Sequence, residues 1–513
     1  MELSRPPFGD VSALREWRAN GPTAGGAGLD ARWALLAVVC LSQLIVIVDI
    51  SVVNVALPSI RRDLGFTQAG LQWVVNAYTL MFAGCLLLGG RAADLFGHRR
   101  LLSLGLAMFT GASLVGGFAQ NQSMLVICRG VQGLSGAILS PATLAVLTTA
   151  FAEGRDRSRA MGVWGAASVA GGGTGAVIGG LLTDQLSWRW VLFINVPVGL
   201  VALVGSRLFV PASRPDPSDR PPLDLVGGIL VTSGLIALTY GLVRTNARGW
   251  TSPEVLIWMA AAVLLLGAFV ANETVWADAP LMSFRLLRSR AIAGANLVGF
   301  GINASTFAMW FFLTLYLQGV RGYSALRAGL SFQPMTLAVI IGTFVGSRAV
   351  IRLGVRALAL GPCLLSAAGL MWLSTLGPHS HYWPDVCLPG VLVGIGIGLS
   401  STPIILAATS HVAPDEAGLA SGLVNTTRQV GSSVGLAVLA TVASSRTKSL
   451  LGSAVRPAAG LAARAATSGY ALSLEVAAGL AVATVAAALV IPGRAARPPV
   501  AARAAPTTSP PSD

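Results

Sequence analysis

The sequence predicts an all-helical integral membrane protein, and its composition, its apolar segments and an internal repeat support this fold class. Apolar residues make up 54% of the 513 residues and charged residues only 11%, whereas soluble domains carry about 25% charged residues. The mean hydropathy of +0.71 reflects the same excess of apolar side chains. The chain is therefore best counted in membrane spans of about 20 residues each.

Fourteen apolar segments follow one another along the chain. A window of about 19 residues places them at 33–58, 71–90, 101–119, 124–150, 160–183, 188–210, 223–243, 255–275, 291–318, 328–348, 357–376, 386–410, 418–444 and 468–492. Each is expected to be a helix, because a lipid-exposed strand or loop would leave backbone N–H and C=O groups without partners. The sequence thus predicts fourteen transmembrane helices.

The distribution of Lys and Arg predicts that both termini lie in the cytoplasm. With this orientation the inner segments hold 22 basic residues and the outer segments 11, in agreement with the positive-inside rule. The outer segment 444–467 is the weak point, because it carries four basic residues. Residues 1–32 are predicted to form a cytoplasmic tail that stays attached, and residues 493–513 a disordered cytoplasmic tail.

An internal repeat divides the predicted spans into two sets of six. The segment GGRAADLFGHR (89–99) aligns without gaps to GSRAVIRLGVR (346–356), 257 residues later. The fifth and thirteenth spans share glycines 260 residues apart, because Gly162, Gly171 and Gly175 pair with Gly422, Gly431 and Gly435. The predicted architecture is a six-helix bundle (33–210), two inserted helices (223–275) and a second six-helix bundle (291–492), with the halves related by a pseudo-two-fold axis.

Four motifs in the chain carry a family resemblance. They are GGRAADLFGHRR (89–100), RGVQGLSGA (129–137), VDISVVNVALP (48–58) and SWRWVLFINVP (187–197). Together they resemble motifs of the major facilitator superfamily, and in particular of its fourteen-span drug:proton antiporters. The likeness extends from about Asp49 to Val442 and includes EAGLASGLVNTTRQVGSSVG (416–435). It implies the major facilitator fold and the export of drugs or antibiotics.

The loop after the second span is a candidate cytoplasmic gate. The residues that match the superfamily's loop signature are Gly90, Asp94, Gly97, Arg99 and Arg100. A tight turn with an acid at one helix end and two arginines at the next can form a charge-assisted latch, and the resemblance implies that this latch stabilises the outward-open state. Positive-inside anchoring is the alternative for the two arginines. Ile351 replaces the acid in the second copy, so the two halves are not equivalent there.

Arg129 is a candidate proton-coupling residue. It lies five residues into the fourth span and is followed by Gly130, Gln132 and Gly133. Snorkelling to the outer interface is the alternative for an arginine at this depth. The repeat has Val391 at the corresponding place when Pro141 is aligned with Pro403. The resemblance ties Arg129 to proton coupling.

The fifth span carries a row of glycines that favours close helix packing. The candidates for this antiporter packing motif are Gly171, Gly175, Gly179 and Gly180, and the first three are four residues apart on one helix face. The antiporter motif of the family has Gly-Pro where this chain has Gly175-Ala176. Without that proline, the kink that it would cause is not expected.

Asp49 is the candidate proton site. It lies about sixteen residues into the first span, where a carboxylate costs several kcal/mol unless it faces a protein interior or a water-filled path. A carboxylate shielded from water binds protons more strongly, and a nearby cation reverses this effect. If protons and substrate cations compete for this carboxylate, inward proton flow can drive outward drug movement. A purely structural hydrogen bond is the alternative for Asp49, and Arg428 is open between a packing role and a coupling or substrate role.

The predicted function is proton-coupled export of hydrophobic compounds, cationic ones among them, by a plasma-membrane protein that is not an enzyme. Neither a cofactor nor a bound metal is expected, nucleic acid is not an expected partner, and the protein is expected to be monomeric among its lipids. Trp310, Phe311 and Tyr316 are candidates for the cavity wall, with lipid-facing packing as the alternative. An uptake transporter for a small metabolite and a non-transporting receptor or scaffold are the alternative functions.

Overall fold

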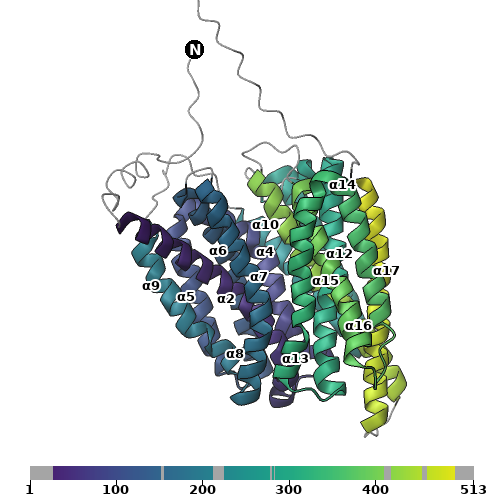
Figure 1. Ribbon diagram of the computed structural model, residues 1–513. Coiled ribbons are helices and arrows are strands. Elements are labelled where there is room, and N and C mark those ends of the chain that lie inside the picture. Colours follow the sequence, from purple (N-terminus) through teal and green to yellow (C-terminus); the bar gives the residue numbers. More distant parts are fainter. Residues whose placement is uncertain are drawn as a thin grey trace, which may run out of the picture.

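The computed structural model describes residues 27–151, 155–211, 224–277, 280–281, 284–408, 417–452 and 459–491. All regular elements within these ranges are helices, which confirms the all-helical class. Figure 1 shows most of these helices side by side, with the N-terminal ones (purple to blue) on one side and the C-terminal ones (green to yellow) on the other.

The N-terminal set contains eight helical elements. They are α2 (Ala27–Leu64), α3 (Gln68–Leu71), α4 (Trp73–Phe96), α5 (His98–Gly117), α6 (Gln122–Ala150), α7 (Arg155–Gln185), α8 (Trp190–Phe193) and α9 (Asn195–Phe209). Side chains that accept hydrogen bonds from the first turn fix several helix starts, as Asn121 does when it accepts from the Met124 N–H at 2.9 Å.

The helices α10 (Leu225–Arg248) and α11 (Pro253–Ala271) form a hairpin between the two sets, and a short π-helical turn, η2 (Asn272–Trp276), follows. Asp224 caps α10, and Asn272 donates a hydrogen bond of 2.7 Å to the same carboxylate. The helix α10 packs against both α4 and α16. The helix α11 leaves Val263 and Leu264 more than 70% exposed, as a helix that faces lipid does.

The C-terminal set has the same kind of helix succession. Its elements are η3 (Phe284–Arg288), α12 (Arg290–Leu315), η4 (Tyr316–Val320), α13 (Ala325–Ser331), α14 (Gln333–Leu373), η5 (Tyr382–Cys387), α15 (Leu388–Ala408), α16 (Ala417–Leu451) and α17 (Ala459–Val490). The helix α14 comprises two helices that meet at Gly354, where φ is 78° and the helical conformation is interrupted.

Twelve helices in the described part of the chain are long and apolar enough to cross a membrane. The predicted spans outside this group are α4, whose apolar stretch Trp73–Leu86 is shorter, and α16, which carries the polar run Asn425–Gln429. A multi-pass membrane protein is therefore established, and the count of fourteen spans stays a prediction.

Several helices extend beyond the predicted apolar segments. The helix α2 begins at Ala27, inside the predicted tail 1–32, while residues 1–26 lie outside the described residues, as do 492–513. Most of the predicted outer loop 444–467 is helical, because α16 runs to Leu451 and α17 begins at Ala459. The loop was predicted as the gap between the apolar segments 418–444 and 468–492, but Ala and Arg both favour helix, and a helix does not have to end where the hydrocarbon does.

The internal repeat predicted from the sequence is visible in the backbone. Gly97 and Gly354 both have positive φ, at 93° and 78°, and both lie in the turn between two helices. Gly65 and Gly322 also have positive φ, at 68° and 67°. Each pair is 257 residues apart, so the same left-handed turns recur in the same register.

Helix contacts recur in the same way. A Cβ added at Gly133 on α6 would lie 2.2 Å from the Tyr78 carbonyl oxygen of α4, and one at Gly394 on α15 would lie 2.6 Å from the Met335 carbonyl of α14. Glycine is required in both places because the backbones touch. The largest buried apolar cluster runs from α2 through α12 to α17, so the core continues from one set into the other.

Candidate functional site

A buried ion pair lies inside the N-terminal set. The Arg129 guanidinium on α6 donates from Nη1 to the Asp49 carboxylate on α2. The side chains are 2% and 0% exposed. A buried charge pair is retained only when both charges are compensated, because desolvation costs several kcal/mol per ion.

Neutral polar side chains complete this network. Gln132 Nε2 donates to Asp49 Oδ1 at 3.0 Å and to Ser113 Oγ at 2.8 Å. Asn195 Nδ2, at the start of α9, donates to the same carboxylate oxygen at 2.7 Å. Asp49 thus accepts hydrogen bonds from three side chains, those of Arg129, Gln132 and Asn195.

Arg129 is held by three further contacts. Its Nε donates to the Val74 carbonyl at 3.0 Å, and its Nη1 donates to Gln132 Oε1 at 2.8 Å. The guanidinium also lies 4.6 Å from the centre of the Tyr78 ring, within the range of a cation–π interaction. Arg129 therefore points into the protein, and the snorkelling alternative is excluded by its 2% exposure.

The sequence named Asp49 and Arg129 separately, and the structure brings them together. The sequence prediction missed the roles of Asn195, Tyr78 and Ser113. Gln132 could have been found, because it lies three residues after Arg129 and therefore on the same helix face. Asn195 and Ser113 come from other helices, and no spacing in the sequence links them to Asp49.

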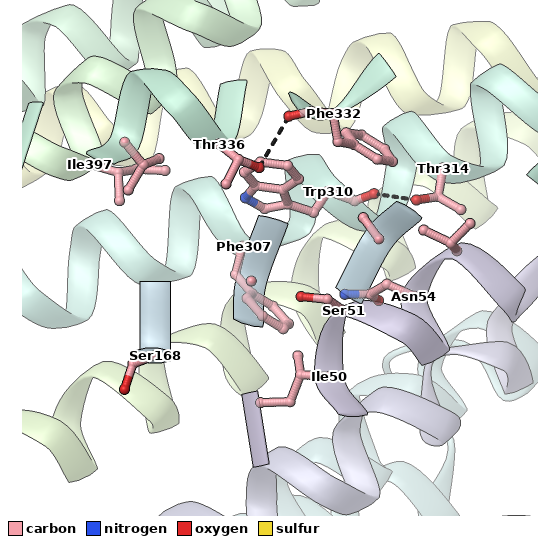
Figure 2. A pocket seen from close by; sticks show the side chains of 14 residues that line it. Ile50, Ser51, Asn54, Ser168, Phe307, Trp310, Thr314, Phe332, Thr336 and Ile397 are labelled. Atoms are coloured by element: carbon pink, nitrogen blue, oxygen red, sulfur yellow. Dashed lines mark hydrogen bonds between the residues drawn. The ribbon is translucent and has the colours of Figure 1, made fainter. Parts of the chain in front are cut away.

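A cavity of about 310 Å³ lies between the two sets. Its lining residues come from α2, α7, α12, α14 and α15, with one from the turn before α14, and they are Ile50, Ser51, Asn54, Val55, Ser168, Gly172, Ala176, Phe307, Trp310, Thr314, Phe332, Thr336, Val339 and Ile397. Figure 2 shows Ser51 and Asn54 on α2 facing the rings of Phe307 and Trp310 on α12. The lining is largely apolar, as small-molecule pockets are.

Asp49 is next to this cavity in sequence but does not line it. The lining residues of α2 are Ile50, Ser51, Asn54 and Val55, while Asp49 is fully buried among α6 and α9. Successive residues of an α-helix point about 100° apart, so one helix presents the carboxylate to its own set and the amide of Asn54 to the cavity.

Of the other candidate residues, Trp310 alone belongs to the cavity lining. The side chain of Arg428, on α16, packs on α12, where a Cβ at Gly299 would lie 3.1 Å from its Cγ. It belongs neither to the cavity lining nor to the Asp49 network. Trp310 lines the cavity, whereas Phe311 and Tyr316 are buried in the core at 2% and 1% exposure. None of the three aromatic side chains fits the lipid-facing alternative.

The predicted cytoplasmic gate is only partly visible. Gly97 forms the turn between α4 and α5, Gly90 lies within α4 close to Pro141, and Arg99 and Arg100 belong to the first turn of α5. The side chain of Asp94 lies outside the described residues. The latch between the acid and the arginines therefore stays a prediction.

The glycine row of α7 packs against α2. A Cβ at Gly171 would lie 3.1 Å from Leu44, one at Gly175 2.8 Å from Ser51, and one at Gly179 2.8 Å from the Val52 backbone. Gly180 differs, because a Cβ there would meet the backbone of α13 at 2.6 Å. The helix continues through Ala176, where the family motif has proline.

Hydrogen bonds join the two sets beyond one end of the cavity. Both Asp184 carboxylate oxygens, at the end of α7, accept from the backbone of α13, at 2.9 Å from Ala325 N and 2.8 Å from Leu326 N. Gln318 Nε2 donates to the Val55 carbonyl at 2.7 Å. These contacts close that end, and none was predicted.

Comparison with known proteins agrees with this geometry. The sequence profile described as Major Facilitator Superfamily matches residues 39–436. The cephamycin export protein CmcT of Amycolatopsis lactamdurans is 45% identical over 416 residues, which cover 80% of this chain and 85% of that protein. The puromycin resistance protein pur8 of Streptomyces alboniger is 41% identical over 423 residues, 82% of this chain and 83% of that protein.

Solved structures share the fold at low sequence identity. A bacterial homologue of the lysosomal transporter Spinster has a TM-score of 0.64 at 17% identity and covers 90% of this chain and 97% of its own. A peptide transporter, POT, has a TM-score of 0.66 at 14% identity and covers 94% of this chain and 98% of its own. At these identities the likeness concerns the fold alone.

Proposed function

The chain belongs to the Major Facilitator Superfamily, and on this premise we propose that it is a proton-coupled exporter of hydrophobic drugs or antibiotics in the bacterial plasma membrane. The observation that carries this proposal is the buried Asp49–Arg129 pair, which shares α2 with a largely apolar cavity. The export and resistance functions named for CmcT and pur8 support it.

The architecture that fits this function is six plus two plus six. In it, residues 33–210 and 291–492 form two six-helix bundles, and residues 223–275 form the inserted hairpin. The helices α4 and α16 complete fourteen spans, and both termini lie in the cytoplasm. The end of α2 that carries Val55 is then periplasmic, and the contacts of Asp184 and Gln318 close the outer side. The structure then represents an inward-facing state of a monomer surrounded by lipid.

Coupling in this proposal runs through α2. A proton on Asp49 neutralises the carboxylate and weakens its attraction to Arg129. The contact between α2 and α6 then changes, and with it the position of Ser51 and Asn54, which belong to the same helix. Proton and cargo act on two faces of one helix, so direct competition for the carboxylate is not needed. A coupling free energy of 1–3 kcal/mol is typical of two such linked sites.

The remaining candidates take supporting roles. The 90–100 loop, with Asp94, Arg99 and Arg100, is the inner gate, because it connects α4 and α5 at the proposed cytoplasmic face. Arg428 is a second intramembrane cation on α16 and acts in the C-terminal set, where it packs against α12.

Replacing Asp49 by Asn tests this function, because the side chain keeps its size and loses its titratable proton. Efflux of a fluorescent hydrophobic dye from a drug-sensitive bacterial host is measured before and after collapse of the proton gradient. The wild-type protein should lower dye retention only while the gradient persists, and D49N should have no gradient-dependent efflux at normal membrane levels. Glu475→Gln, an acid-to-amide change at an exposed position of α17, is the matched control and should behave as wild type. Gradient-driven efflux by D49N would refute the coupling role.

A further inference from the structure

Asn54 carries an unsatisfied hydrogen-bonding group beside the cavity. It lies on α2 among the lining residues, and its Oδ1 atom is buried without a hydrogen-bond partner. Leaving such a group unpaired costs about 1–3 kcal/mol. A ligand that donates a hydrogen bond to it recovers this cost.

Three of the four hydroxyl groups that line the cavity, all except that of Ser51, have only acceptor capacity to offer. Thr314 donates to the Trp310 carbonyl at 2.9 Å, and Thr336 donates to the Phe332 carbonyl at 3.1 Å (Figure 2). Ser168 donates to the Trp164 carbonyl at 3.1 Å. Each of these hydroxyls has one proton, which is already used within its own helix, so only lone pairs remain for a ligand.

The rest of the wall is apolar and uncharged, and it contains three aromatic rings. The rings of Trp310 and Phe332 are 5.3 Å apart at 52°, and Phe307 lies one helical turn from Trp310. None of the fourteen lining residues is ionisable. The nearby carboxylate of Asp49 is buried and already accepts three hydrogen bonds.

We propose that Asn54 determines specificity, and that it selects cargo with a flat apolar body, no charge and a hydroxyl or N–H donor that binds Asn54 Oδ1. This inference rests on the proposed export function and narrows its substrate class. Cargo with a fixed positive charge is selected against, because the charge would have to leave water and enter a cavity whose wall contains no acidic side chain. Cationic drugs, which the sequence suggested as cargo, are then poor substrates.

Two neutral coumarins differ at one nitrogen, which carries the proposed donor in one compound and two methyl groups in the other. The compound 7-amino-4-methylcoumarin has N–H groups, and 7-dimethylamino-4-methylcoumarin has none; ethidium supplies a flat permanent cation. Efflux of each is measured in the same host, and binding to the purified protein is measured by the shift of its unfolding temperature. The wild type should prefer the amino compound by about three- to tenfold, the range of one net hydrogen bond.

Variants of Asn54 should change this preference in opposite ways. The Asn54→Leu variant should export and bind the two coumarins equally, because its affinity for the amino compound falls. Asn54→Asp should gain ethidium relative to both coumarins, because it places a carboxylate in the wall. Thr174→Val, at an exposed position of α7, is the control for a polar-to-apolar change and should keep the wild-type preference.

The outcomes separate this inference from the proposed function. Equal handling of the two coumarins by the wild type, or a wild-type preference for ethidium, overturns the inference even if efflux depends on the proton gradient. Absence of any gradient-dependent efflux overturns the proposed function, while the binding preference of the purified protein still decides the role of Asn54.

Discussion

The interiors of the two helix sets differ although their backbones repeat. Gly175 on α7 packs against Val48 of α2, and Gly435 on α16 packs against Ala304 of α12. When these two contacts are matched, α2 aligns with α12 at an offset of 256 residues, and Ser305 occupies the position that corresponds to Asp49. Ser305 is fully buried, and its hydroxyl donates to the Gly301 carbonyl of its own helix at 2.9 Å.

The partner of Asp49 is also replaced. Gly133 of α6 contacts Tyr78, and Gly394 of α15 contacts Met335 in the same way. Matching these two contacts aligns α6 with α15 at an offset of 261 residues. Gly390, and not the Val391 of the proline alignment, then stands where Arg129 does, and Val393 stands where Gln132 does. The same helix packing thus surrounds a charged network in the N-terminal set and small or apolar residues in the C-terminal set. This difference supports the proposal that proton coupling through Asp49 belongs to the N-terminal set.

The cavity wall follows the same division. With the offset of 256 residues, Ser51 corresponds to Phe307 and Asn54 corresponds to Trp310. The helix α2 presents polar groups to the cavity, and α12 presents aromatic rings (Figure 2). The N-terminal set provides the proposed proton site and the hydrogen-bonding group of Asn54, and the C-terminal set provides the aromatic rings of the wall.

The largest effect should come from breaking the charged network. Arg129→Met leaves the Asp49 charge buried without its cation, so the free energy of unfolding should fall by about 3–5 kcal/mol. Ser305→Ala, at the matching place in the C-terminal set, removes one hydroxyl and should cost about 1 kcal/mol or less. Unfolding of both purified variants in detergent measures the difference. Equal losses would mean that the two interiors do not differ in the way described.

The glycine contacts should respond alike in both sets, because the packing is shared. A Cβ at Gly175 would lie 2.8 Å from Ser51 Cβ and 3.1 Å from the Val48 carbonyl oxygen, and one at the matching Gly435 would lie 2.2 Å from the Ala304 carbonyl oxygen. Either alanine substitution should cost about 1–3 kcal/mol in the same unfolding assay. Gly162→Ala, which meets nothing within 4 Å, is the control and should be neutral or slightly stabilising. A neutral effect at only one of the two contacts would break the equivalence.

The smallest effect should appear at the contact between α7 and α13. Asp184 corresponds to Ser444 at the offset of 260 residues, and Ser444 Oγ is buried without a partner in the part of the chain that the structure describes. Asp184→Ala removes a helix cap worth about 0.5–2 kcal/mol and should open the outer side more often. The measurement is labelling of a cysteine placed at Thr336 in the cavity by a membrane-impermeant thiol reagent added outside.

The matched change on the other set is Ser444→Ala, which should leave this labelling at the level of the parent protein. Slower labelling after Asp184→Ala would contradict the role of this carboxylate in holding the outer side closed, as would an equal increase with Ser444→Ala.

The sequence predicts the class of fold well, because composition and backbone constraints are local. A glycine that must adopt positive φ, as at Gly97 and Gly354, stays in register through the repeat. Helix ends are less predictable, as the helical residues 444–451 illustrate, because helix propensity extends a helix beyond the apolar segment.

The site was only partly predictable. Asp49 and Arg129 stand out as charges in apolar segments, and that signal requires no structure. Their contact with each other, and with Asn195, depends on which helices are neighbours, and hydrophobic periodicity does not fix that arrangement. The face of α2 that lines the cavity was also hidden, because Asp49 and Asn54 both interrupt an otherwise apolar helix.

Proton movement during transport tests the central claim most directly. The purified protein is reconstituted in liposomes that contain a pH-sensitive dye, and a gradient of 7-amino-4-methylcoumarin is imposed. We expect the wild type to move protons against the coumarin flux, and D49N to move none while it still binds the coumarin. Proton movement by D49N equal to that of the wild type would contradict the account.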